Sequence, residues 1–166
     1  PTVIIRPTAV YGEGEKDLLS VFKLVNSGFS PIMGFHHQDL TFIYVKDLSY
    51  LVYSALEKGI TNKIYFATDG HVYDKRAFSD TIAKSLGKKP ITIGIPLPII
   101  KAISWVSQHG SALFGKASAL SIEKYQELVA ESWVCQHEDT YTELNYVPHY
   151  TLEKGVEETS AWYKKN

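Results

Sequence analysis

The glycine pair Gly12 and Gly14 is the first feature of this 166-residue chain that could serve chemistry. It follows a short apolar run and precedes a predicted helix, which is the context of a glycine-rich loop that binds a dinucleotide. The third glycine of that fingerprint is absent, because Asp17 stands in its place. Carboxylates at Glu13, Glu15 and Asp17 would also repel a pyrophosphate from the helix N-terminus. The pair is therefore interpreted as a flexible turn.

A second pattern is the spacing Tyr-x-x-x-Lys, which occurs once, at Tyr150 and Lys154. On one helix these residues would share a face, and the lysine could lower the pKa of a tyrosine used for proton transfer. Thr151 is the better N-cap, however, and Pro148 lies two residues before Tyr150. We expect Tyr150 to lie outside the helix that carries Lys154, which removes the catalytic geometry.

Histidines and the single cysteine provide two further candidates. His36, His37 and Asp39 could indicate a metal site, but neighbouring histidines on a strand point to opposite faces, and no third ligand follows at a helical spacing. Cys135 and His137 could indicate a thiol nucleophile, but nothing marks an oxyanion hole or an orienting partner. We interpret these pairs as a solvated hairpin tip and a buried cysteine, with no metal ligand and no catalytic residue.

The elements that must position such residues alternate between strands and helices in the first half of the chain. Short apolar runs predict strands over 3–6, 63–67 and 91–95, and a hairpin that joins 31–33 to 40–45. Residues 8–16 are predicted as a loop. Helices are predicted from Asp17 to Asn26, from Asp47 to Gly59 and from Asp74 to Gly87. The second helix is expected to bury Leu48, Leu51, Val52, Ala55 and Leu56.

Helices dominate the second half of the chain. They are predicted over 99–109, 121–131 and 151–164, with a short extended segment at 133–135. The chain is therefore interpreted as one unit, 1–166, in which 1–95 mixes strands with helices and 96–166 is mostly helical.

Composition excludes several classes of protein. The chain is 45% hydrophobic and 21% charged, with a net charge of −1, which fits a domain with a sizeable core and not a disordered chain or a nucleic-acid-binding domain. No apolar run reaches the roughly 18 residues of a membrane span. The lone cysteine excludes an intramolecular disulfide framework and fits a reducing compartment, so a cytoplasmic location is expected.

The first residues are unusual for a chain terminus, because Pro1 leads at once into the apolar run Val3–Arg6. A natural start usually has a polar lead-in, so we expect the chain to be a piece of a longer protein. Val3–Arg6 would then be an inner strand of a parallel sheet. Without its neighbours it should expose an edge that self-associates, which is compatible with a homo-oligomer.

Several segments resemble, in order, the extended short-chain dehydrogenases/reductases of the NAD-dependent epimerase/dehydratase group. Residues 3–12 (Val-Ile-Ile-Arg-Pro-Thr-Ala-Val-Tyr-Gly) resemble the family's strand and loop "iiRPtavYG". Residues 41–48 resemble its "f-v-y-V-x-D-l" segment, and 63–70 resemble its next strand and turn. Residues 144–148 and 152–156 resemble its closing "L-G-f-x-P … l-e-e-G" pattern, with Asn145 where glycine is usual. The match spans nearly the whole chain.

The resemblance implies an α/β fold, the C-terminal part of a Rossmann-like extended short-chain dehydrogenase with a mostly helical substrate-binding subdomain. It also implies that the glycine-rich loop for NAD or NADP and the catalytic Tyr-x-x-x-Lys precede Pro1, so that the missing N-terminal half would be this chain's partner. The family places the residues around the proline of "RP" beside the nicotinamide. Cofactor contacts are thereby assigned to Ile5, Pro7, Thr8 and Val10.

The same resemblance assigns the substrate side to the helix that begins at Pro96–Pro98, the loop after Tyr11, and Tyr11, Phe35, His36 and His37. Nucleotide-sugar enzymes of this group tend to carry an arginine at the place of Leu40. A guanidinium suits a diphosphate, and a leucine does not. The branch that resembles dihydroflavonol reductases and 3β-hydroxysteroid dehydrogenases, whose substrates are apolar alcohols or ketones, is therefore favoured over nucleotide-sugar epimerases.

Three hypotheses for function remain open. The first is the substrate-binding portion of an NAD(P)-dependent oxidoreductase or epimerase that transfers a hydride at a carbinol or ketone carbon of a small molecule. The second is a non-catalytic dinucleotide-sensing regulator or binding module of the same fold. The third is a free-standing helical interaction domain. In each case the 166-residue chain alone is expected to bind no NAD.

Overall fold

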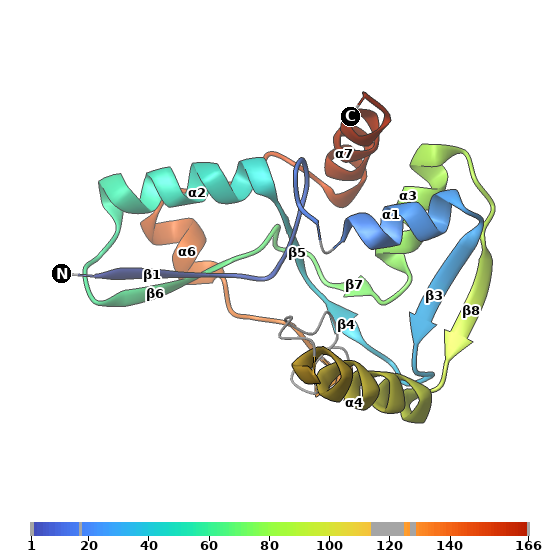
Figure 1. Cartoon of the computed structure of the whole chain (residues 1–166). Helices are drawn as coiled ribbons and strands as arrows, with labels where there is room; N and C mark the ends of the chain where they lie inside the picture. Colours follow the sequence, from blue (N-terminus) through green and yellow to red (C-terminus); the bar gives the residue numbers. More distant parts are fainter. Residues whose placement is uncertain (1, 17, 114–124, 127–128, 166) are drawn as a thin grey trace.

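The computed structural model describes residues 2–16, 18–113, 125–126 and 129–165. It has the α/β architecture that the sequence predicts, with short pairs of strands connected and covered by helices (Figure 1). Three of the strand pairs are parallel, and one is antiparallel. Among the described residues, no helix is long and apolar enough to cross a membrane.

The first parallel pair joins β1 (Val3–Pro7) to β6 (Lys63–Ala67), in register along all five residues. Helices α2 (Val45–Lys58) and α6 (Glu138–Glu143) lie against it, and both contribute to a core with Tyr65 and Ala67 at its centre. Side chains alternate between the faces of a strand. Ile4 and Ile64 therefore point to the other face, where they are 45% and 39% exposed.

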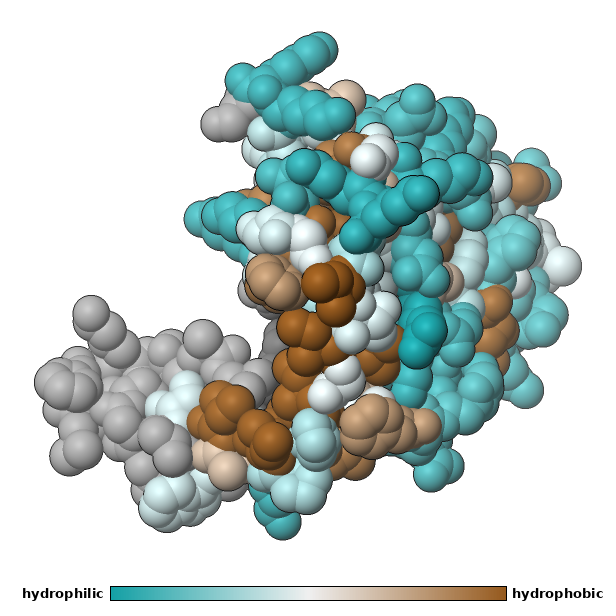
Figure 2. Space-filling view, turned by 90° about the vertical axis from the view of Figure 1, so that its right-hand side faces the viewer, coloured by the Kyte–Doolittle hydropathy of each residue, from teal (hydrophilic) through white to brown (hydrophobic). Residues whose placement is uncertain are grey.

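The second parallel pair joins β3 (Phe29–Met33) to β8 (Ile91–Ile95), at the opposite side of the molecule (Figure 1). The inner strand β3 packs against α1 (Leu19–Asn26), whereas the first four residues of β8 are exposed. Figure 2 looks onto this side and shows apolar surface gathered there. It includes Ile91, Ile93 and the ring of Phe35.

Two shorter pairs connect these sides. β2 (Ala9–Tyr11) lies parallel to β5 (Phe42–Tyr44), and β4 (Asp39–Leu40) lies antiparallel to β7 (Tyr73–Asp74). The predicted hairpin between 31–33 and 40–45 is therefore wrong, and so is the prediction that 8–16 is all loop. Gly34, with φ +65°, turns the chain as a hairpin would, but pairing with the distant β8 and burial of Ser30 and Ile32 decide where β3 lies.

An aromatic core joins the two sides. It packs α1 and α3 (Ala77–Leu86) against α7 (Leu152–Lys165), and the rings of Phe42 and Phe78 stack at its centre with centroids 5.0 Å apart. Stacked and edge-to-face rings at this spacing add to the energy of burial. The chain from β8 continues into α4 (Leu97–Leu113), which begins at the edge of the exposed apolar side.

The predicted strands at 3–6, 63–67 and 91–95 are confirmed, the first one residue longer. Most helix predictions are confirmed too, with small differences at their starts. Asp17 lies outside the described residues, and the carboxylate of Glu15 accepts the backbone N–H of Leu18 at 2.6 Å before α1 begins. Most of the predicted helix at 121–131 also lies outside them, and the polar α6 was not predicted.

Helix α2 differs from its prediction in where it starts and what it buries. It begins at Val45, two residues before Asp47, and it buries Asp47, Leu51, Ser54 and Ala55. Val52 and Leu56 are exposed, Leu56 to 82%, so the predicted apolar stripe is wrong at these positions. Asp47 is buried because it bonds to a distant segment, as described below.

Candidate functional site

The carboxyl end of β1 lies where the chain leaves one parallel pair and enters the next. Pro7 is opposite Ala67, and the Ala67 carbonyl accepts hydrogen bonds from the backbone N–H of Thr8 at 3.0 Å and from its Oγ1 at 3.2 Å. The chain then continues directly into β2. Ligands of parallel α/β sheets bind at the carboxyl ends of strands, so this crossing is a candidate cofactor edge.

The four predicted cofactor residues divide into two groups. Pro7 is exposed and Thr8 is half-buried at the edge, but Ile5 and Val10 pack into the core beneath α2 and α6. The amide and hydroxyl of Thr8 are already bonded to Ala67. The surface that these four residues offer to a ligand is therefore apolar, with the Pro7 ring as its exposed part.

Tyr11 is part of the core. Its ring is 1% exposed, its hydroxyl donates to the Thr151 carbonyl at 3.4 Å, and it lies so close to Gly155 that a Cβ there would meet the hydroxyl at 2.3 Å. Of this part of the predicted substrate side, the loop after Tyr11 lies nearer the surface than the Tyr11 ring. The ring itself anchors α7.

That loop, which carries the glycine pair, is a turn as predicted, but α7 holds it. The hydroxyl of Tyr163 donates to the Glu15 carbonyl at 2.6 Å. Lys46 lies between the carboxylates of Glu13 and Glu158, at 3.0 and 2.8 Å. These contacts leave Glu13 paired and the loop without a cradle for a pyrophosphate.

The turn at 34–37 lies against the start of α4. Lys75 donates its ammonium protons to the carbonyls of Gly34, at 3.2 Å, and His36, at 2.5 Å, and a Cβ on Gly34 would meet Leu97 at 2.9 Å. Nε2 of His36 is buried and has no hydrogen-bond partner among the described residues.

The two neighbours of His36 in this turn are both exposed. Phe35 is 77% exposed and covers Gly94, where a Cβ would meet its ring at 2.5 Å. His37 is exposed and bonds to Asp39 at 2.7 Å. The turn at 34–37 and the start of α4 thus lie together, as expected. The Tyr11 ring, which was expected on the same substrate side, lies in the core instead.

The remaining motifs make no catalytic group. Tyr150 precedes α7, as predicted, and the ammonium of Lys154 lies 4.3 Å from the centre of the Tyr150 ring. Nδ1 of His137 contacts the carbonyl of Cys135, not its sulfur. Cys135 is half-buried, and burial raises the pKa of its thiol. Among the described residues, no three histidine, cysteine or acidic side chains form a group that could hold a metal.

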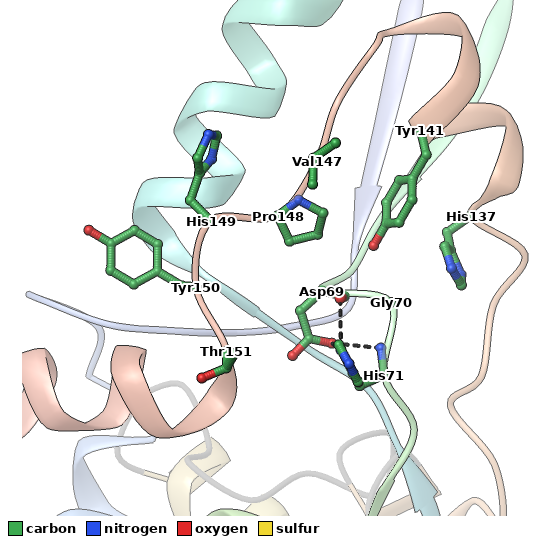
Figure 3. A pocket seen from close by; sticks show the side chains of 10 residues that line it. All are labelled: Asp69, Gly70, His71, His137, Tyr141, Val147, Pro148, His149, Tyr150 and Thr151. Atoms are coloured by element: carbon green, nitrogen blue, oxygen red, sulfur yellow. Dashed lines mark hydrogen bonds and ion pairs between the residues drawn. The ribbon is translucent and has the colours of Figure 1, made fainter.

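A cavity of about 310 Å³ lies beyond the carboxyl end of β6, where the sequence analysis predicted no binding site. Its lining comes from three segments: Asp69, Gly70 and His71; His137 and Tyr141; and Val147, Pro148, His149, Tyr150 and Thr151. In Figure 3, Tyr141 and His137 extend from the α6 side toward the turn at Gly70, while the rings of His149 and Tyr150 point away.

Two buried carboxylates support the walls of this cavity. Asp69 accepts the backbone N–H of His71 at 3.0 Å and the hydroxyl of Tyr73 at 2.7 Å, and burial raises the pKa of Asp69. Asp47 accepts the backbone N–H groups of His149, at 3.1 Å, and Tyr150, at 3.0 Å, and also contacts Nδ1 of His149 at 3.2 Å. Asp47 therefore fixes the 147–151 wall to α2.

Comparison with known proteins identifies relatives in sequence and in fold. No protein-family model matches the chain. It is 26% identical over 161 residues to UDP-glucose 4-epimerase from Vibrio cholerae, a match that covers 95% of this chain and 45% of the relative. The chain spans about half the length of the curated relatives it matches.

Solved structures share the fold. A human epimerase family protein determined with NADPH superimposes with a TM-score of 0.74 at 17% identity, covering 96% of this chain and 48% of that one. The dTDP-glucose 4,6-dehydratase of Bacillus anthracis, in complex with NAD, superimposes with a TM-score of 0.69 at 19% identity, covering 100% of this chain and 45% of that one.

Proposed function

We propose that this chain is the substrate-binding portion of an NAD(P)-dependent oxidoreductase or epimerase. It resembles the extended short-chain dehydrogenases/reductases of the NAD-dependent epimerase/dehydratase group in sequence and in fold. The resemblance predicted from the motifs is confirmed. The proposed parent enzyme transfers a hydride at a carbinol or ketone carbon, with its glycine-rich loop and its Tyr-x-x-x-Lys upstream of Pro1.

One observation carries this proposal. The exposed Pro7 and the neighbouring Thr8 lie at the carboxyl end of a parallel strand, where the chain crosses from the β1–β6 pair to the β2–β5 pair. Parallel α/β sheets bind nucleotides outside the carboxyl ends of their strands. The hydrogen bond from the Thr8 backbone N–H to the Ala67 carbonyl holds this edge in place.

The residues fit one part of a dinucleotide. The apolar ring of Pro7 suits the flat face of a nicotinamide, which supplies or accepts the hydride. Glu13 places a carboxylate, paired with Lys46, at Gly12–Gly14, and negative charge there disfavours a pyrophosphate. This chain would therefore hold the nicotinamide end, and the upstream half would hold the rest of the cofactor.

The substrate side is proposed at the turn 34–37, the start of α4 and the loop after Tyr11. The turn presents the exposed ring of Phe35 and the half-buried His36, whose Nε2 has no hydrogen-bond partner among the described residues. Leu40 packs against the aromatic core, so its position offers no charge to a diphosphate. Apolar alcohols or ketones are therefore favoured over nucleotide sugars.

A dinucleotide-sensing regulator of the same fold is the second candidate. The same cofactor edge supports it, because binding a nicotinamide needs no proton transfer. The two candidates differ in one group, the upstream tyrosine that would act as acid and base.

The test compares the 166-residue chain with the longer protein that includes the residues upstream of Pro1. Calorimetry should detect NAD(H) or NADP(H) binding only in the longer protein, which should also oxidise or reduce an apolar alcohol or ketone. In that protein His36→Ala should raise KM more than it lowers kcat, while His71→Ala, an exposed histidine outside the turn, should leave both unchanged. Dinucleotide binding without turnover, in a protein that lacks the upstream tyrosine, would favour the regulator.

A further inference from the structure

We infer that the cavity beyond β6 is a binding site for a small planar organic cation, such as an aromatic amidine or amine. It lies beside the cofactor edge but uses other residues, and this inference does not depend on the proposed function. Its volume, about 310 Å³, is at the lower end of ligand pockets and suits a single ring with a short polar group.

The walls of the cavity are flat and aromatic. His137 and Tyr141 lie with ring centroids 4.7 Å apart on one side, and the Pro148 ring and the Gly70–His71 turn lie around them (Figure 3). A Cβ on Gly70 would meet the Tyr141 hydroxyl at 2.7 Å, so the glycine lets the Tyr141 side chain approach this turn closely. Aromatic faces attract cations through their quadrupole.

The polar atoms of the cavity are mainly acceptors. Nδ1 of His71 contacts the Asp69 carbonyl at 3.0 Å, and Nδ1 of His137 contacts the Cys135 carbonyl at 3.3 Å. A carbonyl only accepts hydrogen bonds, so in each neutral ring Nδ1 carries the proton and Nε2 is left as an acceptor. The Tyr141 hydroxyl donates to the Thr68 carbonyl at 3.1 Å, which leaves its oxygen lone pairs as acceptors too.

The charges around the cavity are negative. Asp69 is part of the lining, and the buried Asp47 lies behind the 147–151 wall, while none of the lining residues is a lysine or an arginine. Lys154 lies over the ring of Tyr150, which points away from the cavity (Figure 3). A donor-rich cation therefore complements this site better than an anion does.

The test uses the 166-residue chain, with benzamidine as the cation and benzoate as its anionic counterpart. Calorimetry at pH 8 should show saturable benzamidine binding and none for benzoate. Benzoate binding as well as benzamidine at pH 8, or benzamidine failing to bind, would overturn the inference.

Two variants locate the site. His71→Ala and His137→Ala should each weaken benzamidine binding roughly fivefold or more, whereas His37→Ala, an exposed histidine outside the cavity, should leave it unchanged. Thermal unfolding of each variant shows whether the fold is kept. His71 is largely exposed, so its variant keeps the test decisive if His137→Ala destabilises the chain, and wild-type affinity in His71→Ala contradicts the assignment.

Discussion

The two five-residue parallel strand pairs, β1–β6 and β3–β8, have the same length and the same kind of register, yet their surroundings differ. The β1–β6 pair has one face in a core with tyrosines from β6 and the 141–146 segment, and it exposes Ile4 and Ile64 on the other. The β3–β8 pair has an inner strand against helices and an outer strand that is almost wholly exposed.

The difference indicates which side depends more on a buried charge. On the β3–β8 side, the buried serines Ser30 and Ser79 bond to each other as a neutral pair. On the β1–β6 side, a buried carboxylate ties α2 to residues 149–150, across about a hundred positions of sequence. The β1–β6 side should therefore be the more sensitive to single changes.

The largest expected effect is unfolding at alkaline pH. Burial, the main cause, raises the pKa of Tyr44 to about 12 and raises the pKa of Tyr65 and Tyr146 above the ordinary value. A tyrosine whose pKa is raised by folding adds stability that is complete below about pH 10, the unfolded value, and is lost as the pH approaches the folded value. Between pH 10 and 12 the chain should unfold.

Tyrosinate absorbance and far-ultraviolet circular dichroism should change together in that transition. Ionisation of most tyrosines near pH 10, with the helices intact, would contradict the prediction. It would mean that these hydroxyls reach solvent without disturbing the cores that bury their rings.

The next largest effect is expected for Asp47→Ala. It removes the acceptor of the backbone N–H groups of His149 and Tyr150 and should lower the free energy of unfolding by about 3 kcal/mol. Asp80→Ala is the matched control, because Asp80 is also an acid in the first turn of a helix but is exposed. Chemical denaturation measures both. Equal losses would show that the helix dipole, and not the tie to 149–150, is what Asp47 provides.

A smaller effect is expected on the β3–β8 side. Ser79→Ala leaves the Ser30 hydroxyl without its acceptor, at 3.0 Å, and should cost about 1 kcal/mol. Adding Ser30→Ala removes the unpaired group, so the double variant should recover part of that loss in the same denaturation experiment. A double variant less stable than Ser79→Ala would show that the serines contribute by packing and not by this bond.

How much of the fold could be predicted from the sequence depends on how far apart in the chain the contacting residues lie. The strands at 3–6, 63–67 and 91–95 were predictable because apolar β-branched runs are local signals. The partner of β3 was not, because Gly34 signals a turn while the pairing that buries Ile32 is with a strand about sixty residues away. Leu56 was expected inside, because the hydrophobic pattern of α2 carries no sign of the bond that turns Asp47 inward.

The candidate site also has a part that a local motif predicts and a part that depends on contacts between distant segments. Pro7 and Thr8 were found from a contiguous motif, and their place at the carboxyl end of β1 follows from the strand alone. The cavity beyond β6 combines residues near 70, 140 and 150. The motifs in these segments do not point to one another, and only the fold brings Gly70 against Tyr141.

The smallest effect on stability, and the sharpest test of the comparison, concerns the two exposed isoleucines Ile4 and Ile93. Both lie on parallel strands, at 45% and 44% exposure, so Ile4→Lys and Ile93→Lys should each change the free energy of unfolding by less than about 0.5 kcal/mol.

Sedimentation should show self-association of the wild-type chain through the free edge of β1, and a charge on that strand should weaken this self-association. If β1 is the associating edge, Ile4→Lys shifts the chain toward monomer and Ile93→Lys does not. The reverse result would assign association to the apolar surface of β8 (Figure 2), and the β1 edge would then have no role between copies of this chain.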